Sequence, residues 1–276
     1  MSFTTRRTFV AQSAAVLAAS RLAFANKLSK NNLGAQLYTV RNIIDSDPTK
    51  ILQEIRDIGY DEIEATADTL KVWSAIQNSG LIARSIHLNT NPTDEQLADA
   101  KAKGFEYAVI PYIPVEKRGG VDVMKKLAAS LQASGKRAKS HGLQLCYHNH
   151  AFEFEPMNGT TPLQILMSET DPSLVKLEMD IFWVIVAGHN PVDLLKTYAG
   201  RVPLLHLKDK DKSLAATAQY NENVPKETFK EIGNGSIDIP AVLKAAECGG
   251  REALLRGAGS NARSYRESEA KLRVLE

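Results

Sequence analysis

Three short apolar runs in this chain each stop at a side chain that can bind a metal ion or transfer a proton. Runs of this length between turn residues are typical of buried strands. Three such strands with polar C-terminal ends indicate one site at the C-terminal edge of a parallel sheet, where barrel enzymes keep their catalytic groups. The runs are 143–147 before His148 and His150, 175–179 before Asp180, and 202–205 before His206.

Asp180 and His206 have the types expected of metal ligands. A carboxylate and an imidazole at adjacent strand ends suit Mn²⁺, Mg²⁺, Zn²⁺ or Fe²⁺. Two structural alternatives stay open, because Asp180 could cap the following turn and His206 could be a packed core imidazole. His148 and His150 are two residues apart and face one side of an extended chain, either as ligands or as donors to substrate hydroxyls.

Further polar residues stand near the ends of the other predicted strands. Glu153 and Glu155 share a face if their stretch is extended, and one of them could complete a metal site. Lys208 follows His206 by two residues and could polarise a carbonyl group, while Trp183 could stack on a sugar ring or pack in the core. The remaining candidates near the same rim are Gln36, Arg41, Glu64 and His87.

Short strands alternate with amphipathic helices along most of the chain. Seven strand-then-helix units in order indicate a parallel sheet. The length of 276 residues and the absence of a Gly-rich phosphate motif after the first strand favour a (β/α)8 barrel over an open doubly wound sheet. Strands are expected at 33–38, 62–64, 82–87, 107–110, 143–147, 175–179 and 202–205. Helices are expected at 48–58, 70–79, 94–103, 121–140, 162–169, 191–198 and 239–247.

Two segments interrupt the pattern. The polar stretch 208–235 is too long for an ordinary loop and is expected to be a lid or a disordered segment. After Gly250 only Ala253–Leu255 is apolar where an eighth strand belongs. We therefore expect an irregular or defective eighth unit, with a final helix at 268–275.

Composition excludes some classes of protein. Apolar residues make up 43% and charged residues 24% of the chain, which is typical of a globular protein with a sizeable core. The formal net charge is +2 without a basic stripe, which argues against a nucleic-acid partner. Cys146 and Cys248 are too few for a disulfide framework, and Cys146 is expected in the core.

The N-terminus resembles a twin-arginine export signal. Arg6 and Arg7 precede an apolar stretch, 10–19, that is too short to cross a membrane, and Ala23 and Ala25 fit a signal-peptidase site. We expect residues 1–25 to be a signal peptide, residues 26–276 to form the barrel, and the mature protein to be periplasmic.

Five segments resemble the sugar phosphate isomerase/epimerase family, a group of xylose isomerase-like TIM barrels. The resemblance runs from about Leu33 to Cys248. It implies one divalent metal held by a Glu, an Asp, a His and a second Glu from successive strand ends. Asp180 and His206 match directly; His148 stands where the first Glu is usual, so Glu153 is expected to supply that carboxylate. The segments are LGAQLYTVR at 33–41, YHNHAFEF at 147–154, MDIFWV at 179–184, LHLKD at 205–209 and GNGSID at 233–238.

The chain departs from this family where the second Glu should end the eighth strand. Glu252 is the nearest carboxylate, but it stands at the start of the segment. The local switch to Arg, Gly, Ala and Ser suggests the hypothesis that about 249–267 is read out of frame. Resequencing of the coding region tests it, because an unbroken frame across those codons contradicts it.

The resemblance implies an isomerase or epimerase that removes a proton next to a carbonyl of a sugar or keto-sugar. Two alternatives remain: a lyase or dehydratase of the same fold, such as an inosose dehydratase, and a degenerate sugar-binding protein without activity. The partner is a small sugar, and the oligomeric state is open. The expected catalytic residues are Glu153, His148 and Lys208; the metal ligands are Glu153, Asp180 and His206; and the substrate contacts are Gln36, Glu64, His87, His150 and Trp183.

Overall fold

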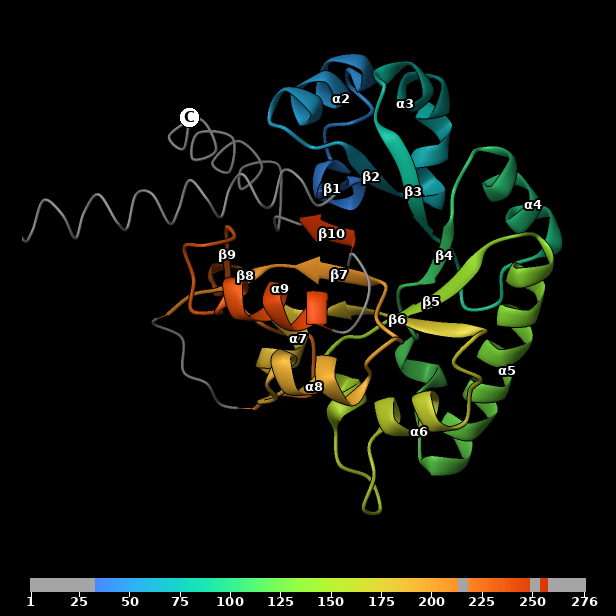
Figure 1. Cartoon of the computed structure of the whole chain (residues 1–276), viewed down its shortest axis with the longest axis vertical. Helices are drawn as coiled ribbons and strands as arrows, with labels where there is room; N and C mark the ends of the chain where they lie inside the picture. The colour runs from blue at the N-terminus through green and yellow to red at the C-terminus, as the bar shows by residue number, and fades with distance from the viewer. Residues whose placement is uncertain (1–32, 213–217, 249–253, 258–276) are drawn as a thin grey trace, which may run out of the picture.

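Eight parallel strands form a closed barrel in the computed structural model of the chain (Figure 1). The structure describes residues 33–212, 218–248 and 254–257, and for residue 248 and residues 254–257 it describes the backbone alone. The order around the barrel is β1-β10-β7-β6-β5-β4-β3-β2. The strands are β1 Leu33–Gln36, β2 Glu62–Thr66, β3 Ile82–His87, β4 Tyr107–Ile110, β5 Gln144–His148, β6 Val175–Asp180, β7 Leu204–Leu207 and β10 Leu254–Gly257.

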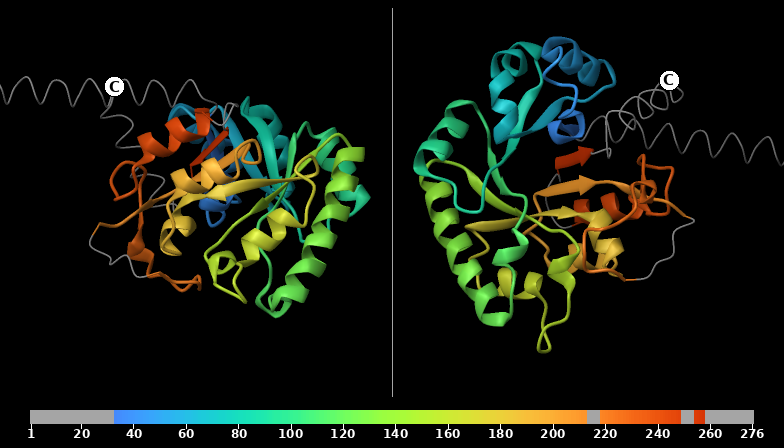
Figure 2. Two further views of the ribbon diagram at one scale, coloured as in Figure 1. Left: turned by 60° about the horizontal axis from the view of Figure 1, so that its bottom comes forward. Right: turned by 180° about the vertical axis from the view of Figure 1, so that it is seen from behind.

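Helices cover the outside of the strands (Figures 1 and 2). Several begin at the residues that the sequence pattern marks. The Thr93 and Thr161 side chains each accept the backbone N–H three residues on, and Gln96 and Gln164 reach back to complete two capping boxes. The α-helices are α2 Pro48–Asp57, α3 Trp73–Ser79, α4 Asp94–Ala102, α5 Val121–Ser140, α6 Pro162–Ser168, α7 Ile181–Val186, α8 Pro191–Thr197 and α9 Ile239–Cys248.

Two apolar cores flank the strands. The larger lies between the strands and the helices and includes Leu145, Leu177 and Leu205. A smaller one, formed by Val109, Cys146 and Leu204, belongs to alternate positions of β4, β5 and β7. Because strand side chains alternate between faces, residues two positions beyond Cys146 and Leu204 lie on the same side, and these are His148 and His206. On this side of the strands, polar side chains therefore come directly after the smaller core in the direction of the C-terminal strand ends. The prediction that Cys146 is a core residue is confirmed.

The eighth strand exists and closes the barrel. Strand β10 pairs in parallel with β1 through Leu33–Leu255 and with β7 through His206–Arg256. Strand β10 has only four residues. The helix expected at 268–275 lies outside the described residues, and so does the proposed signal peptide. Most of the segment 249–267, which we proposed to be read out of frame, also lies outside them.

The polar stretch 208–235 is ordered in its described part. It contains the antiparallel pair β8 Asp209–Lys210 and β9 Phe229–Lys230, and the 3₁₀ helix η5 Lys226–Thr228. Within the described part of the chain, no helix is both long and apolar enough to cross a membrane.

Candidate metal centre

Six ionisable side chains from five strands gather inside the barrel. All are buried except His87, whose side chain is 10% exposed. Every one of them stands at or close to the C-terminal end of its strand. The sequence pattern predicted this position for His148, Asp180 and His206. The cluster consists of Glu64 on β2, His87 on β3, His148 on β5, Glu178 and Asp180 on β6, and His206 on β7.

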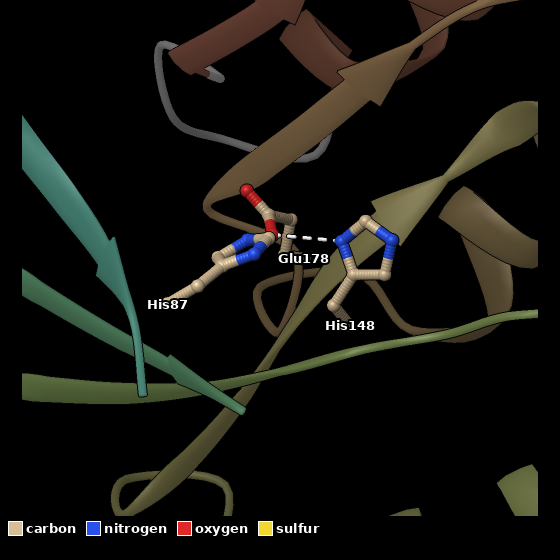
Figure 3. A group of neighbouring side chains, drawn as sticks. All are labelled: His87, His148 and Glu178. Atoms are coloured by element: carbon tan, nitrogen blue, oxygen red, sulfur yellow. Dashed lines mark hydrogen bonds and ion pairs between the residues drawn. The ribbon is translucent and has the colours of Figure 1, made fainter. Parts of the chain in front are cut away.

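Glu178 contacts two histidines of this cluster, His148 and His87. Its Oε2 atom lies 2.9 Å from Nδ1 of His148 and 3.3 Å from Nε2 of His87 (Figure 3). Nε2 of His87 also lies 2.9 Å from Oε1 of Glu64. Burial alone would disfavour the charged imidazole, but the two glutamates outweigh it and raise the pKa of His87 to about 10. His87 is therefore an imidazolium at neutral pH, and its Nε2 faces two carboxylates.

Asp180 has two roles, one for each oxygen. Oδ1 accepts the backbone N–H groups of Phe182 at 3.0 Å and Trp183 at 3.3 Å, and so caps helix α7. Oδ2 lies 2.7 Å from Nζ of Lys208 and 3.4 Å from Nε2 of His148. Burial opposes ionisation, but Lys208 and His148 outweigh it and lower the pKa of Asp180. The helix cap that the sequence left open is therefore present at Oδ1, while Oδ2 faces the charged groups of the cluster.

His206 is buried and neutral. Its ring packs edge-on against His148, with 4.9 Å between the ring centres. Burial and the nearby Lys208 ammonium lower the pKa of His206 well below its usual value. Neither ring nitrogen has a hydrogen-bond partner among the described residues. A buried imidazole in this state is costly unless another group binds it.

A divalent metal ion fits these residues. Ligand atoms of His148, Asp180 and His206 all lie within 4.8 Å of one another, and so do those of Glu64, Glu178 and His206. An imidazole nitrogen from each of His148 and His206, next to the Asp180 carboxylate, forms a mixed nitrogen and oxygen donor set. Such sets suit Zn²⁺, Fe²⁺ or Mn²⁺ better than Ca²⁺.

Glu153 lies in a different environment from these ligands. Its carboxylate accepts the Tyr147 hydroxyl at 2.5 Å and the His150 backbone N–H at 2.8 Å. Burial raises the pKa of Glu153 to about 7, although both hydrogen bonds oppose that shift. Glu153 belongs to none of the metal-capable groups found among the described residues. The geometry therefore favours His148 over Glu153 as the third ligand, while Glu155 is exposed.

An aromatic wall borders the cluster. The His150 ring contacts Tyr112 and Trp183, with 5.5 Å from its centre to each of the other two ring centres, and it is 5.2 Å from the His148 ring. Nδ1 of His150 and Nε1 of Trp183 are buried and have no hydrogen-bond partner among the described residues. Both side chains thus have a polar atom that no described residue binds.

The remaining predicted residues divide between the cluster and the surface. Nε2 of Gln36 lies 3.4 Å from Nδ1 of His87, so Gln36 lies next to the cluster. Arg41 instead covers the ring of Tyr38, which is 52% exposed. Lys208 lies beside Asp180, as its spacing from His206 predicted.

Sequence reasoning missed Glu178. The available signal was its position two residues before Asp180, because a charged residue inside a buried strand faces the same side as the strand-end carboxylate. The missing second Glu of the family has no replacement in β10, whose sequence is Leu-Leu-Arg-Gly and whose backbone pairs Arg256 with His206. Glu178 and Glu64 are the additional carboxylates that the structure supplies.

Comparison with known proteins gives a consistent family assignment. Residues 107–250 match the family model described as xylose isomerase-like TIM barrel. An inosose dehydratase of Clostridium beijerinckii is 32% identical over 125 residues, which are 44% of this chain and 41% of that enzyme. The chain thus spans less than half the length of this relative.

Solved structures of other proteins share the fold. A sugar phosphate isomerase/epimerase of Parabacteroides distasonis superposes with a TM-score of 0.72 at 21% identity, over 88% of this chain and 93% of that one. The IolI protein with a bound zinc atom superposes with a TM-score of 0.67 at 16% identity, over 88% and 96% of the two chains.

Proposed function

Because the chain belongs to the xylose isomerase-like TIM-barrel family, we propose that it is a metal-dependent enzyme that removes a proton next to the carbonyl group of a sugar or keto-sugar. The observation that carries this proposal is the buried group of His148, Asp180 and His206, in which both ring nitrogens of His206 lack a partner among the described residues. A packed core imidazole would find a partner for at least one ring nitrogen.

His148, Asp180 and His206 would hold the metal. Once bound, a divalent ion stabilises negative charge on a carbonyl oxygen, which is worth several kcal/mol to a transition state with enolate character. Glu178 orients His148 through the bond to Nδ1, which leaves Nε2 directed toward Asp180. Lys208 neutralises Asp180 and supplies positive charge at the same place.

The cluster also holds groups that can move a proton. The carboxylates of Glu64 and Glu178 both contact Nε2 of the His87 imidazolium, so we assign proton abstraction to this pair and proton return to His87. General acid–base catalysis of this kind contributes roughly 10²–10⁴-fold. Gln36, His150 and Trp183 border these groups and would bind substrate oxygens.

We assign a different role to Glu153, which the sequence had suggested as ligand and base. Its carboxylate holds the backbone of His150 and the hydroxyl of Tyr147 in place. It would therefore position His150 and would not bind the metal.

The fate of the substrate after proton removal separates two candidate reactions. Return of the proton to a neighbouring carbon or to the opposite face gives an isomerase or epimerase. Loss of a hydroxyl group gives a dehydratase, and the 32% identity to an inosose dehydratase favours this second candidate. Both reactions share the first step.

Exchange of substrate hydrogen with solvent tests that shared step. Purified protein loaded with Mn²⁺ is incubated in D₂O with a panel of aldoses, ketoses and inososes, and the hydrogen next to the carbonyl is followed by ¹H NMR. We expect exchange or water loss with at least one member, abolished in His206→Ala and retained in His141→Ala, which changes a surface histidine paired with Asp94. Metal-loaded protein that exchanges none of the panel contradicts an enzymatic role and favours the sugar-binding alternative.

A further inference from the structure

The segment 218–230 leaves the β7 side of the barrel and reaches the β4 side. The backbone N–H of Gln219 donates to the carbonyl oxygen of Val186 at the end of α7, at 2.9 Å. Three residues later Glu222 contacts the loop that follows β4. In the barrel β6 and β5 lie between β7 and β4, so the segment passes the C-terminal ends of the strands that carry His148 and Asp180.

Arg118 receives the segment on that far side. Its guanidinium carbon lies 3.5 Å from the centre of the Phe152 ring and 4.9 Å from that of Tyr112. Its Nε donates to the Ile113 carbonyl oxygen at 2.9 Å, which fixes the plane of the guanidinium. A cation held this way is pre-organised for a carboxylate partner.

Glu222 is that partner. Its Oε1 atom lies 2.9 Å from a terminal nitrogen of Arg118, and its Oε2 accepts the Tyr112 hydroxyl at 3.3 Å. The Arg118 and Glu222 side chains are 16% and 22% exposed, so the pair is only partly shielded from solvent. Each carboxylate oxygen of Glu222 therefore holds a different residue of one loop.

Two residues of this segment, Glu222 and Phe229, also touch the aromatic wall of the site. Tyr112, which Glu222 holds, packs edge-on against His150. Phe229, at the other end of the segment, stacks on Phe182 at 4.4 Å between ring centres and meets Trp183 edge-on at 6.2 Å. The segment thus contacts both Tyr112 and Trp183, the two rings next to His150.

We propose that Glu222 is a positioning residue that latches segment 218–230 over the site by binding Arg118 and Tyr112, and thereby holds the His150 and Trp183 rings in place. Release of this latch opens the site to substrate. That the segment covers a metal and substrate site rests on the proposed function. The contacts of Glu222 with Arg118 and Tyr112 do not depend on that function.

Fluorescence of Trp183 tests the latch without metal or substrate. The chain has two tryptophans, so a Trp73→Phe background leaves Trp183 as the reporter. In this background Glu222→Gln keeps the shape of the side chain but removes its charge. We expect the acrylamide quenching constant of Trp183, whose residue is 6% exposed, to rise at least twofold. Glu227→Gln, at an exposed position of the same segment, should leave the constant unchanged.

Salt provides a second, independent readout. Screening weakens a partly exposed ion pair, so raising KCl from 0.05 to 1 M should increase quenching in the Trp73→Phe parent and not in Glu222→Gln. Hydrogen exchange followed by mass spectrometry should show faster exchange in Glu222→Gln confined to 218–230 and the loops after β4 and β5.

Two results would overturn the latch. One is equal quenching in Glu222→Gln and Glu227→Gln. The other is faster exchange spread evenly over the barrel, which would show that Glu222 contributes only to overall stability. Failure of the proposed function would leave these measurements unaffected, because they use neither metal nor sugar.

Discussion

Oε2 of Glu178 lies 2.9 Å from Nδ1 of His148, and this bond determines which imidazole nitrogen faces Asp180. A carboxylate on the far nitrogen of a histidine ligand orients the ring and increases its basicity. Burial opposes the charge on Glu178, but bonds from His148 and His87 outweigh it and lower the pKa of Glu178 well below its usual value. The carboxylate is therefore ionised at neutral pH and can act in this way.

Replacing Glu178 should weaken metal binding, although it removes none of the proposed ligands His148, Asp180 and His206. We expect Glu178→Gln to raise the dissociation constant for Zn²⁺ by about 10–100-fold, measured by competition with a chromogenic chelator. The matched control is Glu169→Gln, since Glu169 is a surface carboxylate with 46% side-chain exposure. Equal affinities of the two variants would show that Glu178 does not support a metal ligand.

The pH dependence of stability should reveal the buried carboxyl of Glu153. Its pKa rises from 4.5 to about 7 on folding, so between these values the folded state binds more protons than the unfolded state. Stability contributed by this group is complete below pH 4.5 and is lost as pH rises to 7, by about 3 kcal/mol in total.

Glu153→Gln mimics the protonated acid and should remove this loss. We expect the free energy of unfolding of the variant, relative to the parent, to increase by about 3 kcal/mol between pH 4.5 and pH 7.5 in urea titrations. A difference that stays constant over this range would show that Glu153 is ionised in the folded protein with an ordinary pKa.

Asp209 should be essential for the fold of the segment that follows β7. Its buried carboxylate accepts the backbone N–H groups of Gly233 and Gly235 at 2.9 Å and of Ile237 at 3.0 Å. Asp209→Ala leaves these donors unpaired, so we expect a loss of at least about 3 kcal/mol in the free energy of unfolding. Asp193→Ala, at an exposed carboxylate, should change stability by less than about 0.5 kcal/mol.

Gly235→Ala tests the same contact from the other side. A Cβ atom at this position would overlap the Asp209 carboxylate and the Lys210 carbonyl oxygen, so the turn and the carboxylate cannot both keep their places. We expect destabilisation of similar size to that of Asp209→Ala. The double variant should lose less than the sum of the two single changes, because both disrupt one contact.

Most of the barrel could be predicted from the sequence because its strands are short apolar runs bounded by turn residues. The bounds of β3 and β4 agree with prediction, and so do those of α5. The prediction for β7 was two residues too early, because Pro203 lies before the strand and His206 lies inside it. Helix α7 was missed, since its residues 181–186 are apolar on every side and show no helical periodicity.

The site was less predictable than the fold because spacing shows which residues share a face but not which of them meet. Asp180, His206 and Lys208 meet as expected, since each is placed by a strand end. Glu153 was predicted as a ligand from a family pattern, but the turn after β5 directs its carboxylate to Tyr147. This pairing depends on the three-dimensional course of the turn, which residue spacing does not encode.

Export by the twin-arginine pathway remains a prediction from residues 1–25, which lie outside the described residues. We expect the full chain to reach the periplasm of a bacterial host and the double variant Arg6→Lys, Arg7→Lys to stay in the cytoplasm, as shown by fractionation and immunoblotting. Lys50→Arg, in helix α2, is the control for a basic substitution elsewhere. Export that is unaffected by the double variant would contradict a twin-arginine signal.

Metal content of the purified protein tests the central claim most directly. By mass spectrometry after dialysis, we predict about one equivalent of Zn, Fe or Mn per chain in the wild type, in His141→Ala and in Glu153→Gln. His206→Ala and His148→Ala should retain less than a tenth of that amount. Full metal content in His206→Ala and His148→Ala, or its loss in Glu153→Gln alone, would contradict a site built from His148, Asp180 and His206.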